Sequence, residues 1–208
     1  VQEALRRNID VVSEVELAYD VCKSPILGVT GTNGKTTTTT LLTQVMESTG
    51  LPVKVGGNIG DSLSEAAYRM PEGGYLVAEL SSYQLETIKS FCPLGAIVLN
   101  VTPDHLARHK TMENYAAAKA RIFMNQNGEN FVVLNDDDPI VQAMKKDAHS
   151  KILSISQQHK VESGAYFEGN TCYAVSDGKA IPIIDTEHIH IKGSHNIENI
   201  LAVIALRS

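Results

Sequence analysis

The segment from Gly28 to Thr37, which reads GVTGTNGKTT, constrains this chain more than any other. It follows a short apolar run that ends at Val29, and it precedes a threonine-rich segment with helical character. Glycines let a loop turn with its N–H groups directed at anionic oxygens, and the following helix adds its positive N-terminal end. Lys35 would supply a mobile positive charge, and Thr36 a hydroxyl for Mg²⁺. The stretch therefore predicts a phosphate-binding loop between a strand and a helix.

The glycine spacing departs from the strict phosphate-loop pattern, which needs a glycine where this chain has Val29. Glycines occur instead at positions 28, 31 and 34. A Gly-Lys-Thr sequence after a strand and before a helix is nevertheless specific, so we favour the binding of a small nucleotide over a merely glycine-rich loop.

Composition excludes several classes of function. Of the 208 residues, 43% are hydrophobic and 20% charged, which is typical of a globular protein with one large or two small domains. A formal net charge of −6 argues against nucleic acid as a partner. No apolar run approaches the ~18 residues of a membrane span, and the first residues lack the apolar core of a secretion signal. Three widely spaced cysteines predict no disulfide framework, so we expect reduced thiols and a cytoplasmic protein.

The two ends of the sequence suggest part of a longer polypeptide. The chain begins without methionine and ends inside an apparent helix. Residues 1–24 offer too little for a domain, and we interpret them as the tail of a missing N-terminal domain or linker. Residues 25–208 would form the domain that carries the phosphate-binding loop.

Apolar runs alternate with helical patterns through most of the chain. This alternation predicts an α/β fold, with helices on both faces of a mostly parallel sheet of the P-loop type. Ligands in such sheets collect beyond the carboxyl ends of the strands. We expect strands at 25–29, 52–56, 75–80, 96–100, 131–135 and 151–155, and helices at 35–49, 63–70, 113–125 and 139–146.

From Gly164 onward the pattern changes to short alternating runs, separated by turn dipeptides such as Asp177-Gly178. Such dipeptides are typical of hairpins. We expect a small antiparallel patch beside the main sheet, and then a helix that begins near residues 194–196. Its strands would be 165–167, 171–175, 180–183 and 188–191.

Two expected strand ends carry groups suited to metal or phosphate chemistry. Glu79 ends the third strand, where a carboxylate near the phosphate-binding loop is well placed to hold Mg²⁺ together with Thr36. The fourth strand leads into the segment Asn100–His105. Two roles are open to His105, namely ligation of a second divalent ion or a hydrogen bond to phosphate. Asp104 either orients an imidazole or caps the next helix.

Other polar residues give weaker signals. Lys119 lies in an alanine-rich helical segment, for which a solvated helix face is the favoured interpretation from the residues alone. His188 and His190 fall on one face of an expected strand, but a third metal ligand is not evident.

Several segments resemble the Mur ligases of peptidoglycan synthesis. The resemblance covers nearly the whole chain in family order, through Thr30–Thr37, Gly56–Gly60, Glu79–Glu86, Leu99–His105, Tyr115–Ile122, Asn135–Asp137 and Gly193–Asn199. Within the family, Gly-Gly-Asn-Ile-Gly and Glu-Leu-Ser-Ser-Tyr-Gln-Leu-Glu favour the branch that adds D-glutamate over the branches that add alanine or diamino acids.

The resemblance implies an ATP-dependent amide ligation. The carboxylate of UDP-N-acetylmuramoyl-L-alanine would attack the γ-phosphorus to form an acyl phosphate, from which the amine of D-glutamate displaces phosphate. The implied catalytic residues are Lys35, Glu79, His105 and Lys119. A first magnesium would bind Thr36 and Glu79, and a second His105 and a carbamylated Lys119. ATP would contact Gly31, Thr32, Asn33, Gly34, Lys35, Thr36 and Thr37, with Asn196 and Asn199 on the adenine side, while Asn58, Ser81 and Gln84 would face the muramyl substrate.

The sequence departs from the family in two respects. Ala107 stands where the family usually has an acidic residue, three positions after the aspartate of the Asp-His pair. The resemblance also covers only the middle one of three family domains, so the N-terminal uridine-nucleotide domain and the C-terminal domain with the D-glutamate site would be absent.

Alternative interpretations remain open at this point. The chain resembles other Mur ligases too, and by itself it would be a nucleotide-binding module without ligase activity. A folylpolyglutamate-synthase-like enzyme is disfavoured, because that group has Gly-Ser after its loop lysine where this chain has Thr36-Thr37. In each case we expect a monomer with small-molecule partners, away from nucleic acid and membranes.

Overall fold

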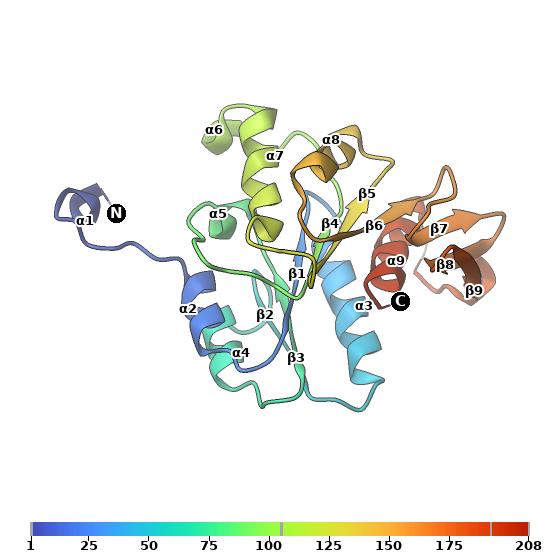
Figure 1. The fold of residues 1–208 in the computed structure, drawn as a ribbon, viewed down its shortest axis with the longest axis horizontal. Helices are drawn as coiled ribbons and strands as arrows, with labels where there is room; N and C mark the ends of the chain where they lie inside the picture. The colour runs from blue at the N-terminus through green and yellow to red at the C-terminus, as the bar shows by residue number, and fades with distance from the viewer. Residues whose placement is uncertain (1, 105, 192, 208) are drawn as a thin grey trace.

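The computed structural model describes residues 2–104, 106–191 and 193–207, and within these residues nine strands form one continuous sheet (Figure 1). The strand order is β2-β3-β1-β4-β5-β6-β7-β8-β9. Neighbours are parallel from β2 to β7, whereas β8 and β9 are antiparallel additions. The strands are β1 (Ile26–Thr30), β2 (Val53–Gly57), β3 (Tyr75–Glu79), β4 (Gly95–Val98), β5 (Phe131–Asn135), β6 (Lys151–Ser156), β7 (Gly164–Glu168), β8 (Thr171–Ser176) and β9 (Lys179–Asp185). The predicted α/β class is confirmed.

Helices cover both faces of the sheet (Figure 1). Side chains alternate across each buried strand, so Ile26 packs into the core beneath α2, α4 and α7, while Leu27 packs into the core beneath α3 and α9. The helices are α1 (Gln2–Arg6), α2 (Glu14–Val21), α3 (Lys35–Glu47), α4 (Leu63–Tyr68), α5 (Ser82–Leu85), α6 (Leu106–His109), α7 (Met112–Ala120), α8 (Pro139–Ala143) and α9 (Ser194–Arg207), with 3₁₀ turns η1 (Arg121–Phe123), η2 (Met144–Asp147) and η3 (Thr186–His188). None of the helices described is long and apolar enough to cross a membrane.

The strand order places a topological switch beside β1. This strand pairs with β3 on one side and with β4 on the other. The chain first builds β2 and β3 on one side of β1 and then returns to build β4, β5 and β6 on the other. Loops that leave β1 and its neighbours diverge there, so the carboxyl edge of β1 is the expected place for a ligand.

The C-terminal part differs from the prediction in two ways. The antiparallel patch is continuous with the main sheet, because β7 pairs with β6 in parallel before β8 and β9 complete the hairpins. The predicted strand at 188–191 is wrong, since η3 and a bend follow β9 and leave His188 and His190 exposed. Alternation of apolar and polar residues predicts a strand only where a neighbouring strand supplies backbone partners.

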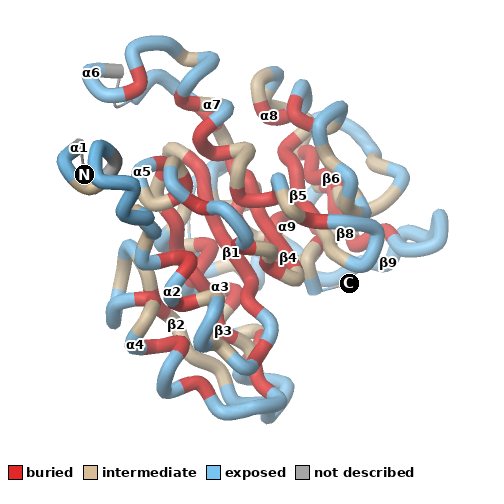
Figure 2. Tube along the Cα trace, turned by 60° about the vertical axis from the view of Figure 1, so that its left-hand side comes forward, coloured by how far each residue is buried: buried red, intermediate tan, exposed pale blue. Residues whose placement is uncertain are grey.

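Helix α2 was not predicted, although it contributes to the core. Ser13 caps its first turn by accepting a hydrogen bond from the Glu16 N–H at 3.3 Å, while Val15 and Ala18 are fully buried. Figure 2 shows that buried stretches of the trace occur within α2. The Glu16 carboxylate is buried too, where it accepts the backbone N–H groups of Lys89, Ser90 and Phe91. Residues 14–21 therefore pack on the same core as the loop-bearing sheet.

Candidate nucleotide-binding site

The loop between β1 and α3 begins where the fully buried strand β1 ends. Gly34 adopts a positive φ of 84° at the N-terminus of α3. A Cβ atom there would lie 2.3 Å from Oδ1 of Asn199, so only glycine allows α9 to approach the loop this closely. Thr36 and Thr37 occupy the first turn of α3, where helix N–H groups point away from the helix and suit anions.

Asn100, which follows β4, holds this loop in place. Its carbonyl oxygen accepts the Thr32 N–H at 2.9 Å, and its side-chain oxygen accepts the Asn33 N–H at 2.8 Å. Its amide group donates to the Asn33 carbonyl at 3.2 Å and to the Glu198 carboxylate at 2.9 Å. Burial raises the pKa of Glu198, and the hydrogen bond from Asn100 partly opposes this rise. The sequence placed Asn100 at a strand end but assigned it no role; an amide directly after an apolar strand is the signal that was available.

Lys35 and Lys119 both direct their amines at the loop. Lys35 Nζ donates to the carbonyl oxygens of Gly31, at 3.0 Å, and Thr32, at 2.8 Å. Lys119 Nζ reaches the same Gly31 oxygen at 2.7 Å and lies 4.5 Å from the ring centroid of Tyr115. Lys119 is only 1% exposed, so the interpretation of its segment as a solvated face is wrong.

Burial lowers the pKa of both amines. It lowers the pKa of Lys119 to about 7, with repulsion from Lys35 as the second cause and attraction by Asp104 opposing both. The pKa of Lys35 is lowered by burial as well, while the negative charges of Glu79 and Asp104 raise it. The Lys119 amine therefore gives up its proton at a much lower pH than an exposed lysine does.

Glu79 presents a buried carboxylate at the carboxyl end of β3. One oxygen accepts the Asn58 side-chain amide at 2.8 Å, while Oε2 is buried without a hydrogen-bond partner among the residues described. The Asn58 N–H also donates to the Glu79 carbonyl at 2.8 Å. Gly57 makes this approach possible, since a Cβ at its φ of 110° would lie 2.3 Å from that carbonyl oxygen.

The donor set at Glu79 fits a divalent cation. A buried anionic oxygen without a hydrogen bond is costly unless a cation or donor meets it. Magnesium prefers one or two carboxylates together with phosphate and hydroxyl oxygens. Glu79 at the end of β3 and Thr36 in the first turn of α3 offer those ligand types beside the phosphate-binding loop.

Two of the expected muramyl-facing residues form a compact helix cap. Ser81 and Gln84 build a capping box at the start of α5, in which Ser81 Oγ donates to Gln84 Oε1 at 2.8 Å and accepts the Gln84 N–H at 3.4 Å. The Gln84 side-chain oxygen is therefore already hydrogen-bonded within the cap. The side-chain NH₂ of Gln84 is the group suited to an incoming acceptor.

The expected adenine-side residues lie on the first turns of α9. Asn199 is buried, accepts from Thr38 Oγ1 at 3.1 Å and donates to Asn196 Oδ1 at 3.2 Å. Its side chain thus joins α9 to α3 behind the loop. His105, expected as a metal ligand, lies outside the described residues, and its neighbours Asp104 and Ala107 are exposed.

Fold and loop together define a class of protein: an open α/β domain of the nucleotide-binding type, with a glycine-rich loop at the switch point of its sheet. The family is also clear. The chain belongs to the Mur ligases, because residues 29–207 match the model of the Mur ligase middle domain.

Relatives of known name agree with this assignment. A UDP-N-acetylmuramoylalanine--D-glutamate ligase of Thermoanaerobacter pseudethanolicus is 48% identical over 202 residues, which cover 97% of this chain and 44% of that protein. The ligase of the same name from Pelotomaculum thermopropionicum is 44% identical over 205 residues, covering 99% of this chain and 45% of that protein. The chain therefore spans less than half the length of these relatives.

Solved structures with the same fold are Mur ligases too. A UDP-N-acetylmuramoyl-L-alanyl-D-glutamate--2,6-diaminopimelate ligase matches 91% of this chain and 44% of its own, with a TM-score of 0.71 and 26% identity. A UDP-N-acetylmuramate:L-alanyl-gamma-D-glutamyl-meso-diaminopimelate ligase from Neisseria meningitides covers 99% of this chain and 68% of its own, at a TM-score of 0.70 and 23% identity. The second likeness is one of fold alone.

Proposed function

We propose that this chain is the ATP-binding domain of a cytoplasmic, monomeric ligase that joins D-glutamate to UDP-N-acetylmuramoyl-L-alanine in peptidoglycan synthesis. The names of relatives at 44–48% identity support the choice of substrates. The observation that most supports the chemistry is the meeting of Lys35 and Lys119 at the Gly31 carbonyl, with the buried Glu79 carboxylate close enough to oppose the lowering of the Lys35 pKa by burial.

The loop residues would bind the phosphates of ATP. The Lys35 amine would exchange its two carbonyl acceptors for phosphate oxygens, which attract a cation more strongly. N–H groups of residues 34–37 would add neutral donors, and Asn196 and Asn199 would border the adenine. Glu79 and Thr36 would hold Mg²⁺, which supplies positive charge against the repulsion between the triphosphate and the substrate carboxylate.

Lys119 would act after carbamylation. With a pKa of about 7, a large share of its amine is neutral and nucleophilic near pH 7. The amine nitrogen would form a bond to the carbon of CO₂, and one N–H proton would leave to solvent. This step turns a cation into an anionic oxygen ligand, which together with His105 would hold a second divalent ion.

The remaining roles concern the substrate. Asn58, Ser81 and Gln84 would position the muramyl substrate so that its carboxylate attacks the γ-phosphorus in line, with breakage of the bond to the ADP oxygen. The amine of D-glutamate would then attack the acyl carbon and release phosphate. Because the chain spans less than half of its relatives, we expect it to bind ATP without forming the ligation product by itself.

A titration with ATP and magnesium tests this proposal. We expect saturable binding that Lys35→Ala weakens by about 1.5–3 kcal/mol, because a charged hydrogen-bond partner is lost. Lys160→Ala, at an exposed ion pair with Glu168, is the matched control and should bind like the unaltered chain. Equal affinity of the Lys35 and Lys160 variants would overturn the assignment of the loop.

A further inference from the structure

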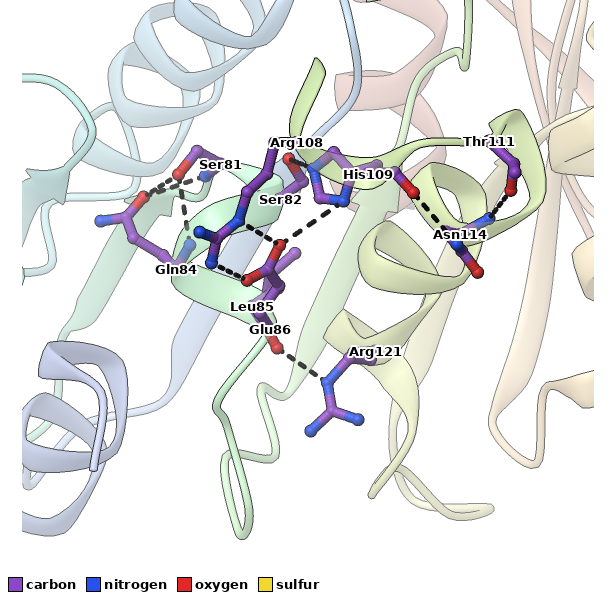
Figure 3. Close-up of polar contacts among 10 residues, drawn as sticks. All are labelled: Ser81, Ser82, Gln84, Leu85, Glu86, Arg108, His109, Thr111, Asn114 and Arg121. Carbon is purple, nitrogen blue, oxygen red and sulfur yellow. Dashed lines mark hydrogen bonds and ion pairs between the residues drawn. The ribbon is translucent and has the colours of Figure 1, made fainter. Parts of the chain in front are cut away.

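His109 is a buried residue that the proposed chemistry does not use, and it lies between the two helices that frame the site (Figure 3). Helix α5 follows Glu79 and carries the Ser81–Gln84 cap. Helix α7 carries Lys119. His109 ends α6 and contacts both of them, and it is 6% exposed.

Both nitrogens of the imidazole have polar neighbours on the α5 side. Nε2 lies 2.9 Å from Ser82 Oγ, and Nδ1 lies 3.5 Å from the Glu86 carboxylate. The ring stacks on Tyr83 with centroids 5.6 Å apart. Arg108 binds the other Glu86 oxygen at 2.6 Å, and this hydrogen bond is the main cause that lowers the Glu86 pKa.

The same residue also anchors the start of α7. The His109 carbonyl accepts the side-chain amide of Asn114 at 3.0 Å, and the ring lies 5.0 Å from that of Tyr115. Tyr115 in turn lies under the Lys119 amine. These contacts lead from α5 through the imidazole and Tyr115 to the lysine. Figure 3 shows the part of them that joins Ser82, His109 and Asn114.

A second tie holds the far end of α7. Arg121 donates from Nε to the Leu85 carbonyl at 2.8 Å and from Nη2 to the Ile88 carbonyl at 2.5 Å. Lys119 lies in the chain between Arg121 and the residues of α7 that contact His109. The contacts at the two ends of α7 together fix the position of this helix against α5.

Serine, histidine and glutamate in this order match the residue types of a hydrolytic triad. Ser82 is 2% exposed, however, so its hydroxyl cannot meet a substrate. A buried hydroxyl and a buried imidazole instead need each other, because either one loses its partner if the other moves. The contact between Ser82 and His109 is therefore structural and holds α6 against α5.

We propose that His109 is a positioning residue, which fixes α7 and thereby directs the Lys119 amine at the Gly31 carbonyl. Only the chemical role of the Lys119 amine rests on the proposed function, whereas its position at the Gly31 carbonyl does not. Loss of the His109 contacts on α5 frees the first turns of α7, and the Lys119 amine then gains water.

Chemical labelling of Lys119 with an amine-acylating reagent, read by mass spectrometry, tests the proposal. His109→Phe keeps an aromatic ring beside Tyr83 and removes the polar contacts, whereas His109→Gln keeps an amide for Ser82. We expect His109→Phe to label Lys119 at least about tenfold faster, because local opening becomes easier, and His109→Gln to restore most of the protection. Ser82→Ala should resemble His109→Phe, and the double variant should add little to either.

Ser24→Ala is the control for general loosening, because it removes a buried hydrogen bond to Pro71, remote from α7. Unchanged Lys119 labelling in His109→Phe and Ser82→Ala, or an equal rise in Ser24→Ala, would overturn the proposal. Should His109→Phe fail to unfold cooperatively, Ser82→Ala decides by the same criterion. ATP binding measured on the unaltered chain judges the proposed function separately, so the two can fail independently.

Discussion

Lys35 and Lys119 donate to one acceptor, the carbonyl oxygen of Gly31, at 3.0 and 2.7 Å. One lysine begins α3 and the other lies in the last turn of α7, so the sheet between their helices brings them together. Two cations on one neutral oxygen repel each other, and burial keeps water from screening that repulsion. The charge of Lys119 consequently depends on the presence of Lys35.

Replacing Lys35 should therefore raise the pKa of Lys119. Lys35→Met removes the nearby positive charge, which favours the protonated form, but burial remains as the larger cause and keeps the pKa below its ordinary 10.5. An NMR titration of labelled lysine side chains measures the change. Lys160→Met should leave the Lys119 pKa at about 7, and an unchanged or lower value in Lys35→Met would contradict the electrostatic account.

Glu79→Gln should stabilise the chain when magnesium is absent. The glutamine oxygen still accepts from Asn58, while the buried charge on Oε2 disappears. We expect a gain of about 1–3 kcal/mol in the free energy of unfolding, together with loss of the stabilisation that ATP and magnesium produce in the unaltered chain. Denaturant unfolding with and without ATP and magnesium measures both.

The control for that change is Glu65→Gln, at an exposed helical ion pair with Arg69. It should alter stability by less than about 0.5 kcal/mol. A Glu79→Gln variant that keeps its full response to magnesium would remove Glu79 from the cation site.

Gly34→Ala should cost far more stability than Gly50→Ala. Both glycines have positive φ angles, 84° and 79°, so alanine is strained at each by about 1 kcal/mol. A Cβ at Gly34 also meets Oδ1 of Asn199 at 2.3 Å, while nothing lies within 4 Å at Gly50. We expect a further loss of about 1–3 kcal/mol for Gly34→Ala from displacement of α9, and equal losses would contradict this reading. Thermal unfolding gives the comparison.

The Glu16 carboxylate should make stability depend on acid pH. Burial raises the Glu16 pKa, but hydrogen bonds from Ser90, Lys89 and Phe91 together lower it below the ordinary 4.5. The unfolded chain then binds more protons in that range, so this stabilisation is present above about pH 4.5 and is lost as pH falls through the lower folded pKa.

Glu16→Gln should accordingly lower the free energy of unfolding at pH 7 by about 1–2 kcal/mol, since neutral hydrogen bonds replace charged ones. The difference from the unaltered chain should shrink below about pH 4.5. Unfolding curves from pH 3 to 7 measure it, with Glu47→Gln on the exposed end of α3 as control. A difference that stays constant with pH would show that the Glu16 charge does not matter.

Much of the fold was predictable because its signals are local. The parallel strands and α3, α4 and α8 begin within about two residues of their predicted positions, since apolar runs and turn residues mark them. The one-turn helices α5 and α6 were not predicted, because four residues carry no period. Of the four short strands predicted after Gly164, those at 165–167, 171–175 and 180–183 were found and the one at 188–191 was not. The parallel pairing of β7 with β6, which joins these strands to the main sheet, was not predicted.

The sequence by itself determined the loop from Gly28 to Thr37, its place between a strand and a helix, and the family, because each of these lies in contiguous residues. Only the tertiary structure decided the burial and the pKa of Lys119. Its alanine neighbours define no polar face, so burial, the Gly31 acceptor and the Lys35 charge all come from elements distant in the chain. The same holds for Asn100, whose side chain acts only once β4 has brought it against the loop. A charge or an amide acquires its chemistry from what packs around it, and packing is a property of the folded chain.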